Sequence, residues 1–199
     1  MDQPLAKRRR LERSFGGKCG SIAIGSDHGG FALKQQIIAY IKDKYKQVAI
    51  RDFGTSSEEN KVDYPDIASA VCESILDGGF DRGILLDGAG VASGIAANKF
   101  HGIRCGVVHD HFSVSMGRKH NDVNVISLGG KSLGIEAAKE IIDVFVTCEF
   151  EGDRHVPRLQ KIERIEDRYA GSGSSVISGS IRRSSGGSAA TQSPYKLPM

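Results

Sequence analysis

Short runs of β-branched and aliphatic residues alternate with longer amphipathic stretches from residue 21 to residue 169 of this 199-residue chain. This alternation is typical of parallel strands joined by crossover helices. Strands are expected at residues 21–25, 47–53, 82–87, 103–108 and 123–128. Helices are expected at residues 30–44, 65–76, 91–99, 112–119, 133–147 and 155–169. We therefore predict an α/β fold with a single doubly wound five-stranded parallel sheet, a Rossmann-like three-layer sandwich with a C-terminal helix.

The two ends of the chain differ in composition from the alternating segment. Residues 1–20 and 171–199 hold nine of the 27 basic and two of the 24 acidic residues, so the segment between them carries a formal charge of −4. The C-terminal end is rich in Gly and Ser, and its few large apolar residues cannot offset the entropy of ordering. We predict one domain at 21–170 between a disordered basic arm at 1–20 and a disordered Ser/Gly-rich tail at 171–199. The basic run Lys7–Arg10 has two interpretations. It is an arm for nuclear import or anion binding, or it is a plain solvated terminus.

Composition excludes several classes of protein. No apolar run approaches the ~20 residues of a membrane-spanning helix, and the basic N-terminus lacks the apolar segment of a secretory signal. The four cysteines form no CxxC pair, so neither a zinc site nor a disulfide framework is expected, and a reducing compartment such as the cytoplasm fits best. Nucleic acid is not an expected partner, because no clustered basic face with stacking aromatics is found between the ends.

The segment 82–99 reads as a strand, a glycine turn and a helix of small residues. In a doubly wound sheet, ligands bind beyond the carboxyl ends of the strands. Glycines let the backbone approach a ligand closely, and free N–H groups at a helix start favour phosphate, carboxylate or a developing enediolate oxygen. We expect an anion pocket with the acid Asp87 at its lip. Its backbone consists of Gly88, Ala89, Gly90, Val91 and Ala92.

Two other interpretations of this turn remain open. Gly88 and Gly90 begin the GxGxxG pattern of dinucleotide sites, but Ser93 stands at the third glycine and the segment follows the third strand rather than the first. Alternatively, the glycines only make a tight turn between strand and helix.

Five short stretches occur in order along the chain: GSDHGGF at 25–31, DYP at 63–65, GAGVASGIAANK at 88–99, RKHND at 118–122 and EGDRHVPR at 151–158. Together they resemble the ribose-5-phosphate isomerase B family, which includes galactose-6-phosphate isomerase subunits. The likeness covers about residues 21–167.

The resemblance implies a reaction of carbohydrate metabolism without metal or cofactor, in which ribose 5-phosphate or a related phosphosugar is interconverted with its ketose. The sugar ring opens, a base moves a proton between C2 and C1, and the amides of the glycine turn hold the enediolate charge. The resemblance also implies a homodimer or tetramer with sites at the subunit interface, where a partner subunit supplies arginines to the phosphate.

The matching positions carry the family's roles onto this chain as expectations. Asp27 and His28 would lie near the ring and the phosphate, Tyr64 would pack against the sugar, and Asn121 would bind a hydroxyl. His120 would open the ring, a task suited to a histidine because its reference pKa lies near neutrality. The phosphate clamp implied by the resemblance consists of Arg154, His155 and Arg158, helped by Lys131. The bland interpretations are a solvated helix start for the arginines, structural histidines, and a helix-entry turn in which Asp63 caps and Tyr64 packs.

The chain departs from the family at the base. Members carry either a cysteine at the strand end or a glutamate six residues later, and these positions are Asp87 and Ser93 here. Ala89 replaces a usual Ser or Thr, and Lys131 replaces a common Arg. Asp87 is the natural substitute, because a carboxylate can abstract a proton beside a carbonyl. A helix start lowers the pKa of a carboxyl and burial raises it, so the basicity of Asp87 stays open.

Two hypotheses on function follow, an active isomerase that uses Asp87, His120 and Asp27, and a non-catalytic phosphosugar-binding or regulatory protein that lacks the usual base.

Overall fold

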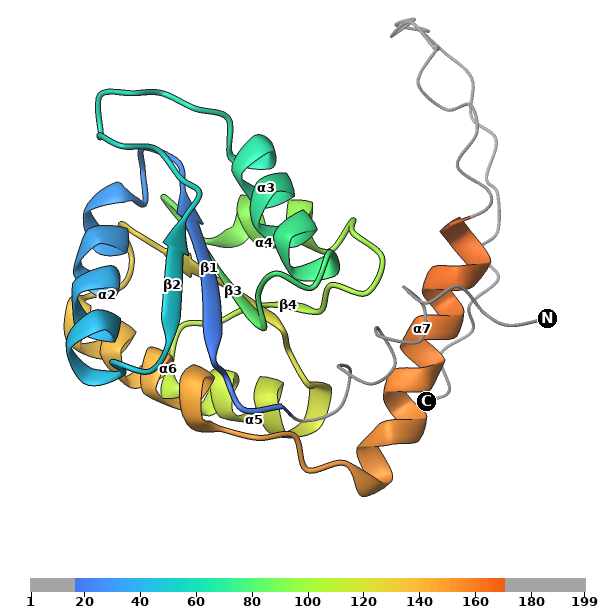
Figure 1. The fold of residues 1–199 in the computed structure, drawn as a ribbon. Helices are drawn as coiled ribbons and strands as arrows, with labels where there is room; N and C mark the ends of the chain where they lie inside the picture. Colours follow the sequence, from blue (N-terminus) through green and yellow to red (C-terminus); the bar gives the residue numbers. More distant parts are fainter. Residues whose placement is uncertain (1–16, 171–199) are drawn as a thin grey trace, which may run out of the picture.

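The computed structural model describes residues 17–170, which form one α/β domain (Figure 1). The strands are β1 (Ser21–Ser26), β2 (Ala49–Asp52), β3 (Arg82–Asp87), β4 (Cys105–Val107) and β5 (Val125–Gly129). All pair in parallel, in the order β2-β1-β3-β5-β4, which confirms the predicted five-stranded sheet. The two edge strands, β2 and β4, are shorter than predicted, as is common where a strand pairs on one side only. The predicted arm at 1–20, apart from residues 17–20, and the predicted tail at 171–199 lie outside the described residues.

Helices cover both faces of the sheet, so the molecule has three layers (Figure 1). On one face, α2 (Phe31–Lys44), α5 (His111–Asn121) and α6 (Ile135–Thr147) pack on alternate side chains of the central strands, such as Ile24, Leu86 and Leu128. On the other face, α3 (Tyr64–Leu76) and α4 (Val91–Ala97) pack on the intervening side chains, such as Ala23 and Leu85. This alternation follows from the two-residue period of a strand.

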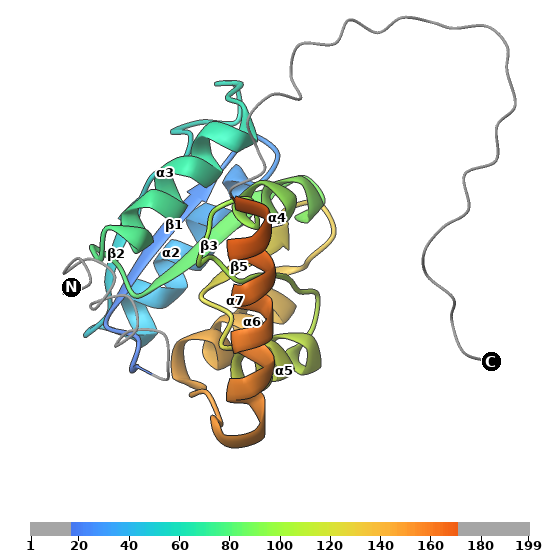
Figure 2. The same ribbon diagram turned by 90° about the vertical axis from the view of Figure 1, so that its right-hand side faces the viewer.

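The last helix departs from these layers. A short 3-10 helix, η1 (Asp153–His155), leads into α7 (Val156–Ala170), which stands apart from the layers as a separate rod in Figure 1 and crosses in front of them in Figure 2. Near its start, Leu159 is buried. Near its end, Glu166 accepts a hydrogen bond from the Gly102 amide at 3.1 Å, and Asp167 lies 2.9 Å from a ring nitrogen of His101. The rod is therefore anchored at both ends.

An ion pair between a buried lysine and a partly exposed aspartate supports the loop that follows β2. Lys34 of α2 is fully buried, and its Nζ donates to both carboxylate oxygens of Asp52, at 2.9 and 2.7 Å, and to the carbonyl of Thr55 at 2.7 Å. The helix and the carboxyl end of β2 are thereby joined. Among residues 17–170, no helix is both long and apolar enough to cross a membrane.

Candidate functional site

Three turns meet at the carboxyl edge of the sheet, where β1, β3 and β5 end. The Gly130 amide donates to the Asp87 carbonyl at 2.8 Å, and the Lys131 amide donates to the Gly88 carbonyl at 3.0 Å. A Cβ atom on Gly29 would lie 3.0 Å from the Gly88 nitrogen, so the turns after β1 and β3 are in direct contact. The structure brings together at this edge most of the predicted site residues, which we call the carboxyl-edge cluster. They are Asp27, His28, Asp87, Gly88, Ala89, Gly90, Val91, Ala92 and Lys131.

The turn after β1 is shaped by Asp27. Its Oδ1 accepts hydrogen bonds from the amides of Gly29 and Gly30, at 2.8 and 3.1 Å. The side chain of His28, which lies between Asp27 and Gly29 in the sequence, is exposed. Tyr64 begins α3 and is 38% exposed, so it does not pack into the core. Asp63 holds the N-cap position of α3 but makes no side-chain capping bond, in contrast to the capping interpretation.

Asp87 lies beneath the glycine turn, not at an open lip. Its side chain is buried, and Oδ1 accepts from the amides of Ala89 and Gly90, at 2.9 and 2.6 Å. Its Oδ2 accepts from the Ser93 amide at 2.7 Å. Burial acts to raise the pKa of Asp87, but the hydrogen bonds from Ser93, Ala89 and Gly90 together hold it below its ordinary value. The turn amides expected to hold an enediolate are thus bonded to the chain's own carboxylate.

A second group of predicted residues gathers around His155, at the end of α5 and the start of α7. The ring of His155 is buried and stacks on that of His120, with centroids 4.2 Å apart and planes 12° apart. Arg154 Nε lies 3.4 Å from His155 Nε2, and Arg158 Nη1 lies 3.5 Å from His155 Nδ1. Burial, with the positive charges of His120, Arg154 and Arg158, lowers the pKa of His155 against the opposing charge of Glu151. We call these five residues and Asn121 the amino-edge cluster.

Arg154 belongs to η1 and Arg158 to α7, so the two arginines do not lie on one face of a single helix. They flank His155 instead.

Three residues of the amino-edge cluster are of types that can bind a metal ion. Donor atoms of His120, Glu151 and His155 lie within 4.8 Å of one another. A metal ion bound by a histidine lies close to the plane of its ring, and two nearly parallel stacked rings cannot both point their lone pairs at one ion. The geometry therefore suits proton transfer and anion binding better than metal coordination.

The two clusters lie at opposite edges of the sheet. In a βαβ unit, the helix begins at the carboxyl edge and returns to the amino edge, so the last turn of α5, with His120 and Asn121, precedes the start of β5. There Val125 pairs with Gly83, whereas Asp87 pairs with Gly129 at the other end. Four residues of strand span roughly 13 Å. His120 and Asp87 of the same chain are therefore far apart. The direction of α5 relative to the strands could have predicted this separation from the sequence.

Sequence reasoning also missed residues that hold these clusters in place. Ser93 was expected only to replace a glycine of the dinucleotide pattern or the family's glutamate, yet its amide binds Asp87. Arg118 and Asp122 flank His120 in the RKHND motif and form a buried ion pair at 2.9 Å. Both residues belong to a motif shared with the family, and this was the signal in the sequence that could have identified them.

Comparison with known proteins gives consistent matches. The sequence profile of the Ribose/Galactose Isomerase family matches residues 22–162. Ribose-5-phosphate isomerase B of Escherichia coli (strain K12) is 44% identical over 147 residues, which cover 74% of this chain and 97% of that protein. D-erythrulose-4-phosphate isomerase of Pectobacterium atrosepticum is 40% identical over 142 residues, 71% of this chain and 92% of that protein. The solved structure of Clostridium thermocellum ribose-5-phosphate isomerase B has a TM-score of 0.72 and 42% identity, and the match covers 75% of this chain and 99% of that one.

Proposed function

Because the chain belongs to the Ribose/Galactose Isomerase family, we propose that it is an aldose–ketose isomerase that interconverts ribose 5-phosphate and ribulose 5-phosphate through an enediolate. The observation that carries this proposal is the contact between the glycine turn, the Asp27–His28 turn and Lys131 at one edge of the sheet. The gathering of backbone amides, a carboxylate and a cation at this edge supports binding of an anionic sugar there. The similarity to named isomerases favours this function over a non-catalytic binding protein.

In the proposed mechanism, Asp87 is the base that moves the proton between C2 and C1. Its carboxylate is a weak base while it accepts three amide hydrogen bonds. We infer that the sugar draws Oδ1 away from Ala89 and Gly90. The freed amides then face the developing enediolate oxygen, and the carboxylate regains basicity because two bonds to its charged form are lost.

The remaining roles require a second subunit. His120 would open the ring, and Arg154 and Arg158 would bind the phosphate, but these residues lie at the opposite edge of the same chain's sheet from Asp87. We propose a homodimer in which the amino-edge cluster of one subunit faces the carboxyl-edge cluster of its partner.

Exposed apolar side chains near the carboxyl edge support such contact. Val91 and Ile95 of α4 are 49% and 58% exposed, and Phe112 at the start of α5 is 72% exposed. Exposed large apolar side chains can mark interaction sites.

Deuterium exchange tests the reaction. Wild-type protein in deuterated water should convert ribose 5-phosphate to the ketose and introduce deuterium at the exchanging carbon, and Asp87→Asn should abolish both. A silent wild type would refute the isomerase, whereas activity unchanged by Asp87→Asn would refute the proposed base alone. Parallel assays with four- and six-carbon phosphosugars measure the preferred chain length.

Mixed dimers test the shared site. Asp87→Asn and His120→Asn each disable both sites of their own homodimer. Random mixing makes half of the dimers mixed, each with one intact site, so activity should recover to about a quarter of wild type. No recovery from subunits shown to exchange would refute the shared site.

We also propose that the protein works in the cytoplasm, because its four cysteines, all within the described residues, are free thiols.

A further inference from the structure

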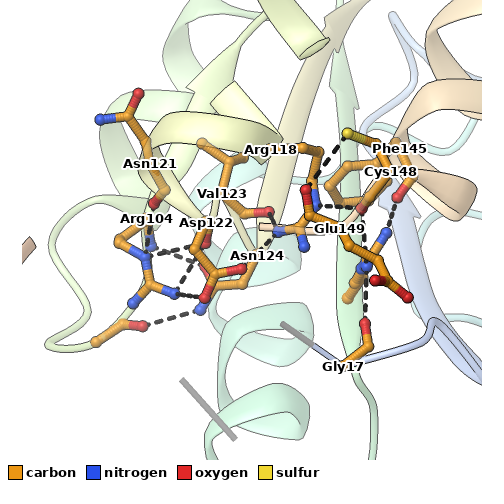
Figure 3. A network of polar contacts seen from close by, with 12 residues as sticks. Gly17, Arg104, Arg118, Asn121, Asp122, Val123, Asn124, Phe145, Cys148 and Glu149 are labelled. Atoms are coloured by element: carbon orange, nitrogen blue, oxygen red, sulfur yellow. Dashed lines mark hydrogen bonds and ion pairs between the residues drawn. The ribbon is translucent and has the colours of Figure 1, made fainter. Parts of the chain in front are cut away.

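We propose that Arg118 is a positioning residue for ring opening, which holds the turn bearing His120 and Asn121 against the loop that leads to Arg154. Figure 3 shows Arg118 with its hydrogen-bond partners Asp122, Val123 and Cys148. The inference rests on the proposed function, since it assigns a task to the neighbours of His120. Arg118 itself is buried, so we assign it an effect on ring opening through its neighbours and not through contact with the substrate.

The core of the arrangement is a carboxylate held between two guanidinium groups. Arg118 Nη1 donates to Asp122 Oδ1 at 2.9 Å, and Arg104 Nη2 donates to Asp122 Oδ2 at 2.8 Å. Arg118 and Asp122 are 2% and 5% exposed. Removing such ions from water costs several kcal/mol each, and a pair of this kind is often no more stabilising than apolar side chains. Stability alone therefore does not explain why charges are buried here.

The same groups fix the backbone directly after His120. Asp122 ends α5 in the left-handed region, with φ of 44°, where glycine is the usual residue. Arg104 Nε donates to the carbonyls of Asn121 and Asp122, at 3.1 and 3.0 Å. Arg118 Nη1 donates to the Val123 carbonyl at 2.6 Å. Three successive carbonyls are thereby held, so the directions of the preceding side chains are set.

Arg118 also reaches the loop between α6 and η1. Its Nε donates to the Cys148 carbonyl at 3.3 Å. Nearby, the Glu151 amide donates to the Lys119 carbonyl at 3.0 Å. These two bonds join the last turn of α5 to the loop three to six residues before Arg154. Arg118 thus links the turn that carries the ring-opening histidine to the loop that carries a phosphate-binding arginine.

This link matters for one chemical step more than for the other. Ring opening needs His120 within hydrogen-bond reach of the sugar ring while the phosphate is held, and a displacement near 1 Å can slow such a step about 100-fold. Proton transfer between C1 and C2 takes place at the carboxyl-edge cluster and does not use His120. The phosphate is common to both substrates, so a change in its binding is removed by comparing the two reactions at saturating substrate. Under that condition, disturbing Arg118 should slow ring opening more than proton transfer.

The two substrates separate these steps. Ribulose 5-phosphate is acyclic, because its 5-hydroxyl carries the phosphate, so exchange of its C1 proton with deuterated solvent needs no ring opening. Net conversion of ribose 5-phosphate, which is mostly a closed ring, does need it. In Arg118→Lys the charge is kept, but a single ammonium replaces the fork that reaches both Asp122 and Cys148. We expect the ratio of ketose exchange to aldose conversion to rise about tenfold or more.

Matched variants complete the experiment. His120→Asn should raise the same ratio. Asp143→Asn disturbs a different charged cluster, in which Asp143 accepts hydrogen bonds from Tyr40, Tyr45 and Lys44, and it should leave the ratio unchanged even if it lowers stability. Where Arg118→Lys does not fold, Asp122→Asn tests the same link.

Each outcome decides a different point. Exchange and conversion that fall in equal proportion in Arg118→Lys would overturn the positioning role and leave the proposed function intact. A wild type inactive in both assays would overturn the proposed function, and the positioning role with it.

Discussion

Replacing Asp87 by alanine removes the acceptor of three backbone amides. The amides of Gly90 and Ser93 are buried, so water does not take the place of the carboxylate, whereas that of Ala89 is more exposed. A hydrogen bond to a charged group contributes about 1.5–3 kcal/mol, and loss of a helix cap typically costs about 1 kcal/mol. We expect Asp87→Ala to lower the free energy of unfolding by about 3 kcal/mol at pH 7, which corresponds to a fall in Tm of about 6–12 °C for a domain of this size.

Asp87→Asn separates the contribution of the second oxygen. Asn retains one oxygen for the amides of Ala89 and Gly90, but it directs an NH₂ group at the Ser93 amide, so two donors face each other. The expected loss is about 1–2 kcal/mol, between wild type and Asp87→Ala.

The effect should depend on pH with a defined sign. The pKa of Asp87 is lower in the folded protein than its ordinary value of about 3.9. Its contribution is then fully present above about pH 4 and is lost as the pH falls through the lowered folded value. The wild-type and Asp87→Asn stabilities should converge below pH 4.

Urea denaturation followed by circular dichroism measures these differences. Protomer concentration must be held constant, because the stability of an oligomer depends on it. An Asp87→Ala protein within 0.5 kcal/mol of wild type, a difference at the level of an ordinary surface substitution, would refute the capping role.

Three further predictions concern positions described above. Gly90→Ala should lower the free energy of unfolding by about 3 kcal/mol in the same urea assay, because its φ is +79° and a Cβ would lie 2.7 Å from the Gly129 nitrogen; a loss under 1 kcal/mol would contradict this. Asp52→Ala should lower the free energy of unfolding by about 3 kcal/mol, because it leaves Lys34 buried without its carboxylate. Adding Lys34→Met to this variant should restore part of that stability, and a further loss of stability would argue against the pairing. The His155 ring should stay neutral at pH 7 and titrate below about 6.5 in an NMR pH series, and a midpoint above that value would count against the lowered pKa.

The sheet and most helix bounds were predictable because strand and helix periods differ strongly in this chain. The strand predicted at 103–108 was too long. Ile103 and Val108 are buried and extend the apolar run, but pairing with β5 covers only Cys105–Val107. Hydrophobicity reports burial, and the end of a strand depends on where its partner diverges.

The sequence was sufficient to predict which turns meet at the site, because the carboxyl ends of parallel strands lie at one edge of the sheet. The direction of the Asp87 side chain was not, since it depends on the amide of Ser93 six residues later. The contact of Arg104 with Asp122 joins residues 18 apart across two elements, and no local pattern encodes it.

The two anchors of α7 limit how this helix can vary. Leu159 fixes the rod near Arg158, and Glu166 fixes it about 10 Å further along, given a rise of about 1.5 Å per residue. A single inserted residue between them would rotate the far anchor by about 100°, and it could no longer meet the Gly102 amide. The spacing between Leu159 and Glu166 should therefore tolerate substitution but not changes of length.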